Sequence, residues 1–405
     1  MRSSKVPMDR KNLMQQSQNH ICQTYNRYNL AISRGSGCYL WDQEGRQYLD
    51  FVAGIAVCNL GHCPMEISRV MYEQAQQLVH VSNLYYTEPQ VRLAEALTGS
   101  CFADKVFFCN SGAEANEAAI KLARKYSRKS YGPGRYGIIT MKNSFHGRTL
   151  ATLSATGQQK IQEGFEPLVD GFRYVDFDSV DAVAEAIDKT VCAVLVEPIQ
   201  GEGGVRVPHG RYLEGLQELC TRHDLLLIYD EIQVGMGRTG KLFSHQHEGV
   251  TPDIMTLAKA LANGMPVGAM LTTDKVAEAF GPGSHASTFG GTPLVTAVAL
   301  EVFRQISAAS FLEEVRSVGE YFRERLLALG EKYPFIKEVR GRGLILGIEL
   351  DFPGSEVVAQ CQERGVLINC TAERVLRFLP PLIVTSTEVD RLIETLESVF
   401  RQKGK

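Results

Sequence analysis

The chain alternates between short apolar runs and segments whose apolar residues recur every three or four positions. Apolar runs end near residues 109, 141, 196, 229 and 258, and each has the length of a strand buried on both faces. This alternation predicts an α/β unit with a mainly parallel, doubly wound sheet through about residue 290. Helical spacing covers residues 64–78 and also follows the first run, in Ala115, Ala118, Ala119, Leu122, Ala123 and Tyr126.

The two ends of the chain have a different pattern. Alternating residues at 35–51, around a Gln-Glu-Gly turn, predict a hairpin. Towards the C-terminus, residues 344–350 predict a strand between helical patterns at 311–326 and 389–400. We therefore expect an N-terminal arm with part of a small α+β domain at residues 1–66, a large domain at 67–295, and the rest of the small domain at 296–405.

Composition agrees with an ordinary enzyme. At 405 residues the chain is longer than one hydrophobic core usually supports. Hydrophobic residues make up 44% and charged residues 22%, and the formal net charge is -3. This balance favours neither disorder nor a polyanionic partner such as nucleic acid.

Two further features bear on the compartment. Residues 1–20 are polar, and no run reaches the roughly 18 apolar residues that cross a membrane. The ten cysteines form no Cys-x-x-Cys pair, which indicates reduced thiols rather than a zinc site or a disulfide framework. We expect a cytoplasmic protein that acts on small molecules and has no membrane partner.

Two charged residues end apolar runs, Asp230 after residues 225–229 and Lys259 after residues 254–258. An isolated lysine in such a place usually extends its apolar stem over the core and keeps its ammonium group in water. A desolvated lysine and a carboxylate together are, however, the two charged groups that pyridoxal phosphate requires, one for its aldehyde and one for its pyridine nitrogen. Ligands of open α/β sheets gather outside the carboxyl ends of the strands, so we expect both residues to face one crevice.

Residues 110–117 turn the first strand into a helix and place small residues at its start. Free N–H groups and the positive end of the helix dipole at such a start suit a phosphate. An ordinary serine N-cap at Ser111, followed by acidic residues, is an equally good interpretation. The segment is not a Walker phosphate loop, because the Lys-Ser/Thr ending is absent.

Other candidates follow the remaining strands. Phe145 is suited to stacking on a cofactor ring and Arg148 to clamping a carboxylate, although a core aromatic and a surface arginine are the default interpretations. A Gly-rich loop at 197–204 lies on the same predicted edge. His62 is interpreted as a loop histidine. Residues 245–248 hold two histidines and a glutamate in a polar stretch without a further ligand, which makes a metal-dependent hydrolase a weak alternative and predicts no metal site.

With these motifs in this order, the chain resembles the class III, fold-type I pyridoxal phosphate aminotransferases over nearly its whole length. The resemblance implies an aspartate aminotransferase-like fold and a homodimer with shared active sites. Where the family often has Gly-His-Cys-His-Pro, this chain departs from it at residues 61–65. The matching segments are residues 39–42, 54–57, 110–117, 145–149, 197–204, 230–233, Lys259, 287–291 and 377–381.

The resemblance also implies roles at the cofactor, pyridoxal 5'-phosphate. Lys259 binds its aldehyde and then moves a proton, Asp230 pairs with the pyridine nitrogen, and Gln233 reaches the ring hydroxyl. Phe145 stacks on the ring. The phosphate is bound by Ser111, Gly112, Ala113 and, from the neighbouring subunit, Thr288.

For the substrates, the resemblance implies that Arg377 binds the α-carboxylate of glutamate and that Glu197 swings in to neutralise Arg377 for an ω-amine donor. Arg148 holds the distant carboxylate of the donor. Tyr25, Ile55 and Ser287 line the substrate pocket. Relatives that act on free ornithine tend to have a tyrosine at the position of Ile55, which favours an acetylated donor here.

The expected activity is transfer of the δ-amino group of N-acetyl-L-ornithine to 2-oxoglutarate, in arginine biosynthesis. The resemblance also allows N-succinyl-diaminopimelate as a second substrate, in lysine biosynthesis. Ornithine, succinylornithine and 4-aminobutyrate are alternative donors. A non-catalytic relative of the fold that only binds small molecules is an alternative of a different class.

Overall fold

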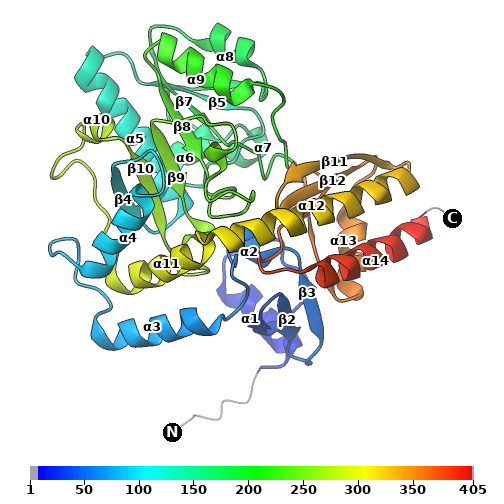
Figure 1. The fold of residues 1–405 in the computed structure, drawn as a ribbon. Helices are drawn as coiled ribbons and strands as arrows, with labels where there is room; N and C mark the ends of the chain where they lie inside the picture. The colour runs from blue at the N-terminus through cyan, green and yellow to red at the C-terminus, as the bar shows by residue number, and fades with distance from the viewer. Residues whose placement is uncertain (1–7, 404–405) are drawn as a thin grey trace.

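The computed structural model describes residues 8–403. Within this range, three β-sheets and their surrounding helices form the molecule (Figure 1). Residues 1–7 of the predicted arm and residues 404–405 of the predicted small domain lie outside the described residues.

The largest sheet has seven strands in the order β4-β10-β9-β8-β7-β5-β6. Strands β9, β8, β7, β5 and β6 are parallel, whereas β10 runs antiparallel to its neighbours β9 and β4. The prediction of a mainly parallel sheet is confirmed, although the pattern of apolar runs did not predict β6 and β10. The strands are Lys105–Cys109 (β4), Gly137–Met141 (β5), Phe172–Val175 (β6), Val191–Val196 (β7), Leu226–Asp230 (β8), Ile254–Leu257 (β9) and Gly268–Thr272 (β10).

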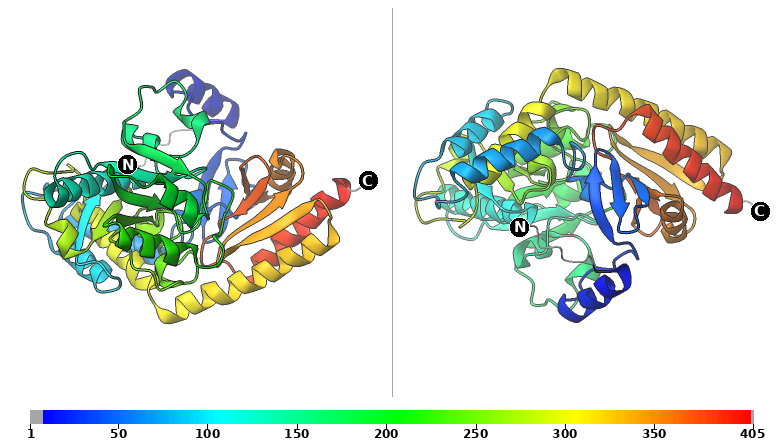
Figure 2. Two further views of the ribbon diagram at one scale, coloured as in Figure 1. Left: turned by 90° about the horizontal axis from the view of Figure 1, so that it is seen from above. Right: turned by 90° about the horizontal axis from the view of Figure 1, so that it is seen from below.

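Helices cover both faces of this sheet, because its central strands are apolar on both sides. Leu195 and Ile228 pack with α5 on one face, whereas Val194 and Leu227 pack with α9 on the other. The two views in Figure 2 show the sheet between its covering helices. The helices of this region are α5 (Gly112–Tyr131), α6 (Leu150–Ala155), α7 (Gln159–Gln162), α8 (Val180–Ala186), α9 (Tyr212–Arg222) and α10 (Asp274–Ala277).

A second group of helices packs beside β4, β9 and β10. Leu93 and Leu97 of α4 share a core with Val298 and Val302 of α11 and with Leu257 of β9. The predicted helix at residues 64–78 is confirmed as α3, which packs against α11. The bounds are Met65–Gln77 (α3), Glu88–Thr98 (α4), Pro293–Ile306 (α11), Lys259–Ala262 (η2, a 3-10 helix) and Ser244–Gln246 (η1, a 3-10 helix).

The two ends of the chain meet in a separate core. Leu49 and Phe51, from the predicted N-terminal hairpin, pack with Phe322, Phe378 and Phe400 from the C-terminal part. The parallel pairing of β3 with β13 also joins the two ends. The elements are α1 (Arg10–His20), β1 (Ile32–Ser36), β2 (Tyr39–Asp42), β3 (Gln47–Asp50), α2 (Ala53–Ala56), α12 (Ala309–Lys332), β11 (Ile336–Arg342), β12 (Ile345–Leu350), α13 (Ser355–Glu363), β13 (Val366–Leu367), β14 (Asn369–Thr371), β15 (Val375–Phe378) and α14 (Ser386–Lys403).

Arg238 ties the loop after β8 to the C-terminal elements. Its guanidinium is fully buried and donates to the carbonyl oxygens of Leu344, at 2.9 Å, and Pro380, at 2.6 Å. It also donates to Asn59, whose amide in turn donates to the carbonyl of Met236 at 3.0 Å. These contacts satisfy carbonyl groups on segments that are far apart in the sequence, so Arg238 fixes the two parts of the molecule around the site between them.

Among residues 8–403, no single helix is both long and apolar enough to cross a membrane. Helices α11 and α12 meet the requirement only as a pair, by length and composition, and they are bent by 66°.

Candidate active site

The carboxyl ends of β8 and β9 bring the two predicted charged residues to one edge of the sheet. Asp230 is the last residue of β8 and stands opposite Thr256 of β9. Lys259 follows β9 at the start of η2, with a left-handed φ of 45°. A non-glycine residue in this conformation is strained, and such strain is typical of residues held for function.

Both residues line a cavity of about 400 Å³ between the sheet edge, the start of α5 and the loop after β7. Its volume is in the range of small-molecule sites. The Lys259 amine makes no hydrogen bond or ion pair with any of residues 8–403. The predicted site residues in the lining are Ser111, Gly112, Ala113, Phe145, Arg148, Glu197, Asp230, Gln233 and Lys259.

Burial makes the Lys259 amine less basic. Desolvation lowers the pKa of Lys259 below its ordinary value, and the nearby Arg377 lowers it further, against the opposing effect of Glu202 and other carboxylates. Part of the amine is therefore neutral at a pH where a surface lysine is fully charged. A neutral amine is the form that condenses with an aldehyde.

Asp230 is held by donors on both of its oxygens. His146 Nδ1 and Asn116 Nδ2 lie 2.8 Å and 2.7 Å from Oδ2. The Ile232 N–H donates to Oδ1 at 3.1 Å. Asp230 is almost fully buried, so these contacts replace the water that an exposed carboxylate would bind.

The start of α5 confirms the serine N-cap and leaves its first turn facing the cavity. Ser111 is the N-cap, and its Oγ accepts from the Glu114 N–H at 3.2 Å. Gly112 and Ala113 form the first turn, whose N–H groups have no acceptor inside a helix. A Cβ on Gly112 would lie 2.8 Å from Ile232, so glycine lets the helix start lie close against the cavity wall.

Arg377 lies on β15 with no exposed surface, and its partner differs from the one predicted. Its NH1 donates to Glu202 Oε1 at 2.6 Å and to Gln233 Oε1 at 3.2 Å. Burial raises the pKa of Glu202, but Arg377 and Lys259 outweigh burial and hold it below the ordinary value. Glu202 is therefore ionised and neutralises the buried guanidinium.

Glu197 does not contact Arg377, so its predicted role as the partner of that arginine is wrong for this structure. It is buried, and it accepts from the Phe145 N–H at 3.1 Å. Burial and the nearby Asp230 raise its pKa well above the ordinary value. Both glutamates line the cavity, but Glu197 belongs to the side of Phe145 and Glu202 to the side of Arg377.

Five predicted residues do not line this cavity, and Arg377, which contacts two residues of the lining, is one of them. Ser287 and Thr288 line a different cavity of about 910 Å³. Ser287 is nevertheless linked to the site, because Asn110 Nδ2 donates to its Oγ at 3.0 Å. Tyr25 and Ile55 are exposed by 73% and 40% and are not part of the lining. A single chain therefore does not bring Thr288, Tyr25 and Ile55 to Lys259.

The histidines of the weaker alternatives have structural partners. His62 Nε2 is 2.7 Å from Asp50 Oδ2, and this contact contributes to raising the pKa of His62 to about 10, against burial. His245 is buried, with its Nδ1 3.0 Å from Glu231 Oε1. The interpretation of residues 245–248 as a polar loop is thus wrong at His245, which belongs to the interior.

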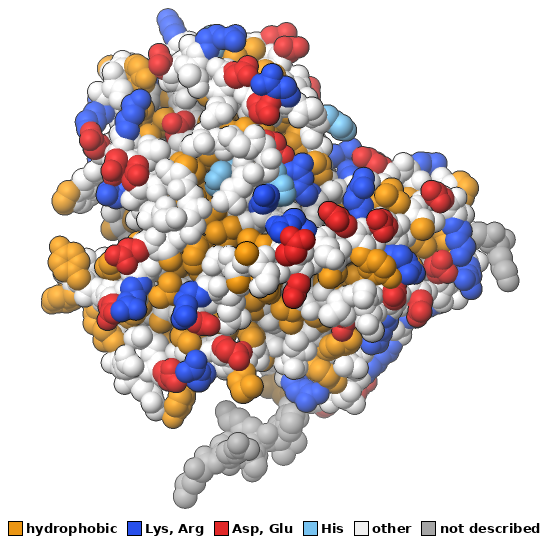
Figure 3. Space-filling model, in the orientation of Figure 1, with side chains coloured by type: hydrophobic (Ala, Val, Ile, Leu, Met, Phe, Trp, Pro, Cys, Tyr) orange, Lys and Arg blue, Asp and Glu red, His pale blue; other side chains and the backbone are white. Residues whose placement is uncertain are grey.

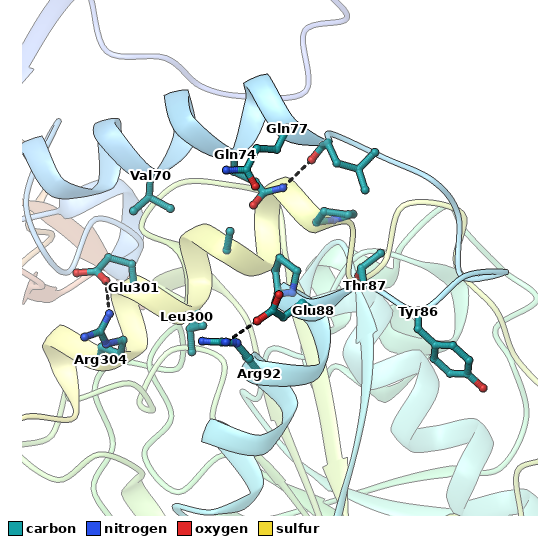
Figure 4. Close-up of a pocket in the computed structure, with 14 residues that line it drawn as sticks. Val70, Gln74, Gln77, Tyr86, Thr87, Glu88, Arg92, Leu300, Glu301 and Arg304 are labelled. Atoms are coloured by element: carbon teal, nitrogen blue, oxygen red, sulfur yellow. Dashed lines mark hydrogen bonds and ion pairs between the residues drawn. The ribbon is translucent and has the colours of Figure 1, made fainter.

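Another cavity of about 560 Å³ lies between α3, α4 and α11 (Figure 4). Its charged residues pair with each other, Glu88 with Arg92 and, at 3.3 Å, Glu301 with Arg304. None of the predicted site residues lines it. The geometry therefore favours the cavity at Lys259 as the active site.

Three residues of this site were not predicted from the sequence: Asn116, His146 and Glu202. His146 and Glu202 stand inside the predicted motifs at 145–149 and 197–204. Their closeness in sequence to Phe145 and Glu197 could have indicated that they belong to the site. Asn116 interrupts the apolar face of the helix that begins at residue 112, and a buried amide there is a signal for a polar partner.

Comparison with known proteins decides the family. The family model described as "Aminotransferase class-III" matches residues 21–400. The chain belongs to the class-III aminotransferase family. An acetylornithine aminotransferase of Caldanaerobacter subterraneus is 50% identical over 95% of this chain and 98% of the relative.

Solved structures agree with the family. An ornithine aminotransferase from Toxoplasma gondii has a TM-score of 0.94 and 35% identity, covering 98% of this chain and 97% of that one. An N-acetylornithine aminotransferase from Stenotrophomonas maltophilia has a TM-score of 0.82 and 39% identity, covering 95% and 97%. The predicted family, the fold-type I architecture and a pyridoxal phosphate-dependent aminotransferase are confirmed.

The residues of the cavity fit this cofactor. Lys259 offers a free amine for its aldehyde, and Asp230 offers a carboxylate for its pyridine nitrogen. The first turn of α5 offers N–H groups for its phosphate. Phe145 in the lining offers a ring for stacking. The roles of the individual residues remain predictions.

The lowered pKa of Lys259 predicts how cofactor binding depends on pH. Only the neutral amine attacks an aldehyde, and burial makes this form available at lower pH. In cofactor-free protein, we expect the rate of covalent pyridoxal phosphate binding to rise with pH and level off below 10.5, the ordinary lysine pKa. Stopped-flow absorbance across a pH series measures this rate. A rate that keeps rising beyond that pKa would contradict the burial argument.

Proposed function

We propose that this chain transfers the δ-amino group of N-acetyl-L-ornithine to 2-oxoglutarate, giving N-acetyl-L-glutamate 5-semialdehyde and L-glutamate, in arginine biosynthesis. The observation that carries the proposal is the ion pair, at 2.6 Å, between the buried Arg377 and Glu202, which lines the cavity of Lys259 together with Arg148. The identity to acetylornithine aminotransferases supports it.

The pair suits an enzyme with two unlike amino donors. Glutamate carries a carboxylate next to its reacting carbon, and an ω-amine donor does not. Arg377 binds the carboxylate when glutamate or 2-oxoglutarate is present. Glu202 neutralises Arg377 when the other donor is present, because a buried guanidinium without a partner is costly. Arg148 holds the distant carboxylate of either substrate.

The charges also favour an acylated donor over free ornithine. Free ornithine brings an α-ammonium group next to the carboxylate that Arg148 holds. Each carboxylate of the lining already accepts hydrogen bonds: Glu197 from the Phe145 N–H, Glu202 from Arg377, and Asp230 from its three donors. An amide in place of that ammonium needs no carboxylate partner.

The remaining roles follow from the positions of Lys259 and Asp230. Pyridoxal phosphate, when bound, supplies an aldehyde that accepts the amino group and a ring that takes up the electrons of the broken C–H bond. Lys259 takes the proton from the substrate carbon and returns it on the other side of the reaction. Asp230 stabilises the protonated ring nitrogen, and the walls of the cavity exclude water.

The visible absorption spectrum tests the activity directly. Adding N-acetylornithine without a keto acid should remove the band of the lysine-bound cofactor and produce that of the pyridoxamine form. Adding 2-oxoglutarate should then restore the first band. A protein that responds to glutamate but not to N-acetylornithine would sink the substrate assignment and leave the aminotransferase intact. Lys259→Ala should bind cofactor and substrates without turnover, whereas a protein that only binds small molecules would show no turnover before the substitution.

Glu202→Gln tests which glutamate neutralises Arg377. Without the charge of Glu202, Arg377 is free to bind the α-carboxylate of glutamate. When N-acetylornithine is bound, however, Arg377 has no ionic partner. We expect the KM for glutamate to fall and the half-reaction with N-acetylornithine to slow, each by about tenfold. Stopped-flow rates of the two half-reactions measure both changes.

Glu197→Gln is the matched control for that substitution. Because Glu197 lies against Phe145, its substitution should change both half-reactions in the same direction. Opposite shifts in Glu197→Gln, with parallel shifts in Glu202→Gln, would restore Glu197 to the predicted role.

We also propose a homodimer whose active sites are shared. Asn83 Nδ2 donates to the Gly290 carbonyl at 2.8 Å, which places the segment at 83–86 beside the loop at 287–291. Figure 3 shows exposed hydrophobic side chains along the side of the molecule formed by α3, α4 and α11. An exposed apolar surface of this kind indicates a protein interface. The segments at 83–86 and 287–291 carry further large exposed side chains, which are Leu84, Tyr85, Tyr86 and Phe289.

Interface variants test the shared site. We expect Phe289→Glu to produce monomers in sedimentation, with weakened retention of pyridoxal phosphate, because Thr288 of one subunit then no longer reaches the phosphate of the other. Leu327→Glu, at an exposed hydrophobic residue of α12, is the control and should stay dimeric. Monomeric Phe289→Glu protein with full cofactor retention and turnover would refute the shared site.

The other predictions are carried forward as proposals. We propose the division at residues 1–66, 67–295 and 296–405, supported by the core that joins Leu49 and Phe51 to the C-terminal elements. The packing of α11 on α3 and α4 moves the proposed second boundary from residue 295 to the end of α11, at Ile306. We further propose a cytoplasmic location and no nucleic-acid or membrane partner, on the composition and the net charge of -3.

A further inference from the structure

A buried chain of hydrogen bonds runs from β9 through α5 to Asp230. Thr256 Oγ1 donates to Asn116 Oδ1 at 2.8 Å. The amide nitrogen of Asn116 donates at 2.7 Å to Asp230 Oδ2 and at 2.8 Å to the carbonyl oxygen of His146. Thr256 and Asn116 have no exposed surface, and His146 is 1% exposed. Every polar atom of the Asn116 side chain is thus engaged.

Two acceptors decide which way the Asn116 amide points. Asp230 Oδ2 and the His146 carbonyl oxygen accept, so the NH₂ group faces them. The amide oxygen then faces Thr256, whose hydroxyl donates to it and holds the side chain in place. The reverse orientation would place the amide oxygen against the two acceptors. The contacts around Asn116 therefore fix its NH₂ group as a donor to Asp230.

The contacts leave one part of Asp230 unused. An ionised carboxylate has about four acceptor positions. Asn116 and His146 occupy Oδ2, and the Ile232 N–H occupies one position on Oδ1. The free position is on Oδ1, in a residue that lines the cavity. That position is suited to one further donor, such as a protonated ring nitrogen.

Asn116 also stands in a fixed relation to the phosphate end of the cavity. It lies four residues after Gly112 on α5, so both face the same side of the helix. Gly112 lines the cavity at the start of the helix, where an anion is favoured. One rigid helix thus sets the separation between the anion-binding turn and the oxygen reserved for the ring nitrogen.

We infer that Asn116, held in place by the Thr256 hydroxyl, is a positioning residue that fixes Asp230 so that Oδ1 receives the ring nitrogen of pyridoxal phosphate. The inference concerns the cofactor of the family and does not depend on the identity of the amino donor. It assigns Thr256 a role through Asn116 and not through the cofactor itself.

Isosteric substitution tests this role. Thr256→Val removes the hydroxyl at nearly constant volume, and Asn116→Leu removes the donor. Thr256→Ser keeps the hydroxyl and should behave like the parent protein. The matched control is Thr140→Val: Thr140 lies fully buried in β5 of the same sheet, and its hydroxyl has no partner in the described part of the chain.

Two readouts need no amino donor. One is the affinity of cofactor-free protein for pyridoxal phosphate, measured by fluorescence titration. The other is the NMR shift of the ring nitrogen in isotopically labelled cofactor, which reports its protonation. For Thr256→Val we expect about fivefold to tenfold weaker binding and a shift towards the unprotonated nitrogen, with a larger effect in Asn116→Leu. With an amino donor, kcat should fall by a similar factor and KM should change little.

Three outcomes are decisive. Loss in Thr256→Val and Asn116→Leu, with parent-like Thr256→Ser and Thr140→Val, supports the inference. Folded Thr256→Val and Asn116→Leu proteins that keep the parent affinity and ring-nitrogen shift overturn it. An equal loss in Thr140→Val also overturns it, because the effect would then come from packing in the sheet.

Discussion

The site depends on keeping one amine desolvated among charges that are already paired. Lys259 is half-buried, and desolvation is the main effect that lowers its pKa; Arg377 adds to it, while three carboxylates nearby act in the opposite direction. If those carboxylates were free, they would favour the ammonium form. Glu202 is instead bound to Arg377, and Asp230 to Asn116 and His146. Desolvation lowers the pKa of the amine, and Arg377 opposes part of the effect of the carboxylates, so the amine is available for an aldehyde.

The fold supplies these pairs from distant parts of the chain. β8 and β9 end side by side and carry Asp230 and the turn to Lys259, while α5 starts at the same edge of the sheet. The Arg377–Glu202 contact joins residues 175 positions apart, from β15 and the loop after β7. Arg238 joins the loop after β8 to the C-terminal elements through the carbonyl groups of Leu344 and Pro380. The site is therefore built at the junction of the sheet and the C-terminal elements.

Much of this could be predicted from the sequence, because local patterns determine it. Apolar runs predicted most strands of the sheet, and a charged residue after such a run predicted Asp230 and Lys259. The choice between Glu197 and Glu202 could not be predicted, because both lie in one loop. Only the tertiary structure turns one to Phe145 and the other to Arg377. His245 was misjudged since its polar neighbours hid a buried pairing with Glu231. The pattern of apolar and polar positions does not show that Tyr25, Ile55 and Thr288 lie away from the cavity of Lys259 within one chain.

The central claim is that Lys259 and Asp230 hold opposite ends of one pyridoxal phosphate molecule at the sheet edge. A crystal structure of the protein with its cofactor tests it most directly. The account predicts continuous density from Lys259 Nζ to the aldehyde carbon, the ring nitrogen within hydrogen-bond distance of Asp230 Oδ1, and the phosphate at the start of α5. A cofactor that is not joined to Lys259, or whose ring nitrogen faces away from Asp230, would contradict the account.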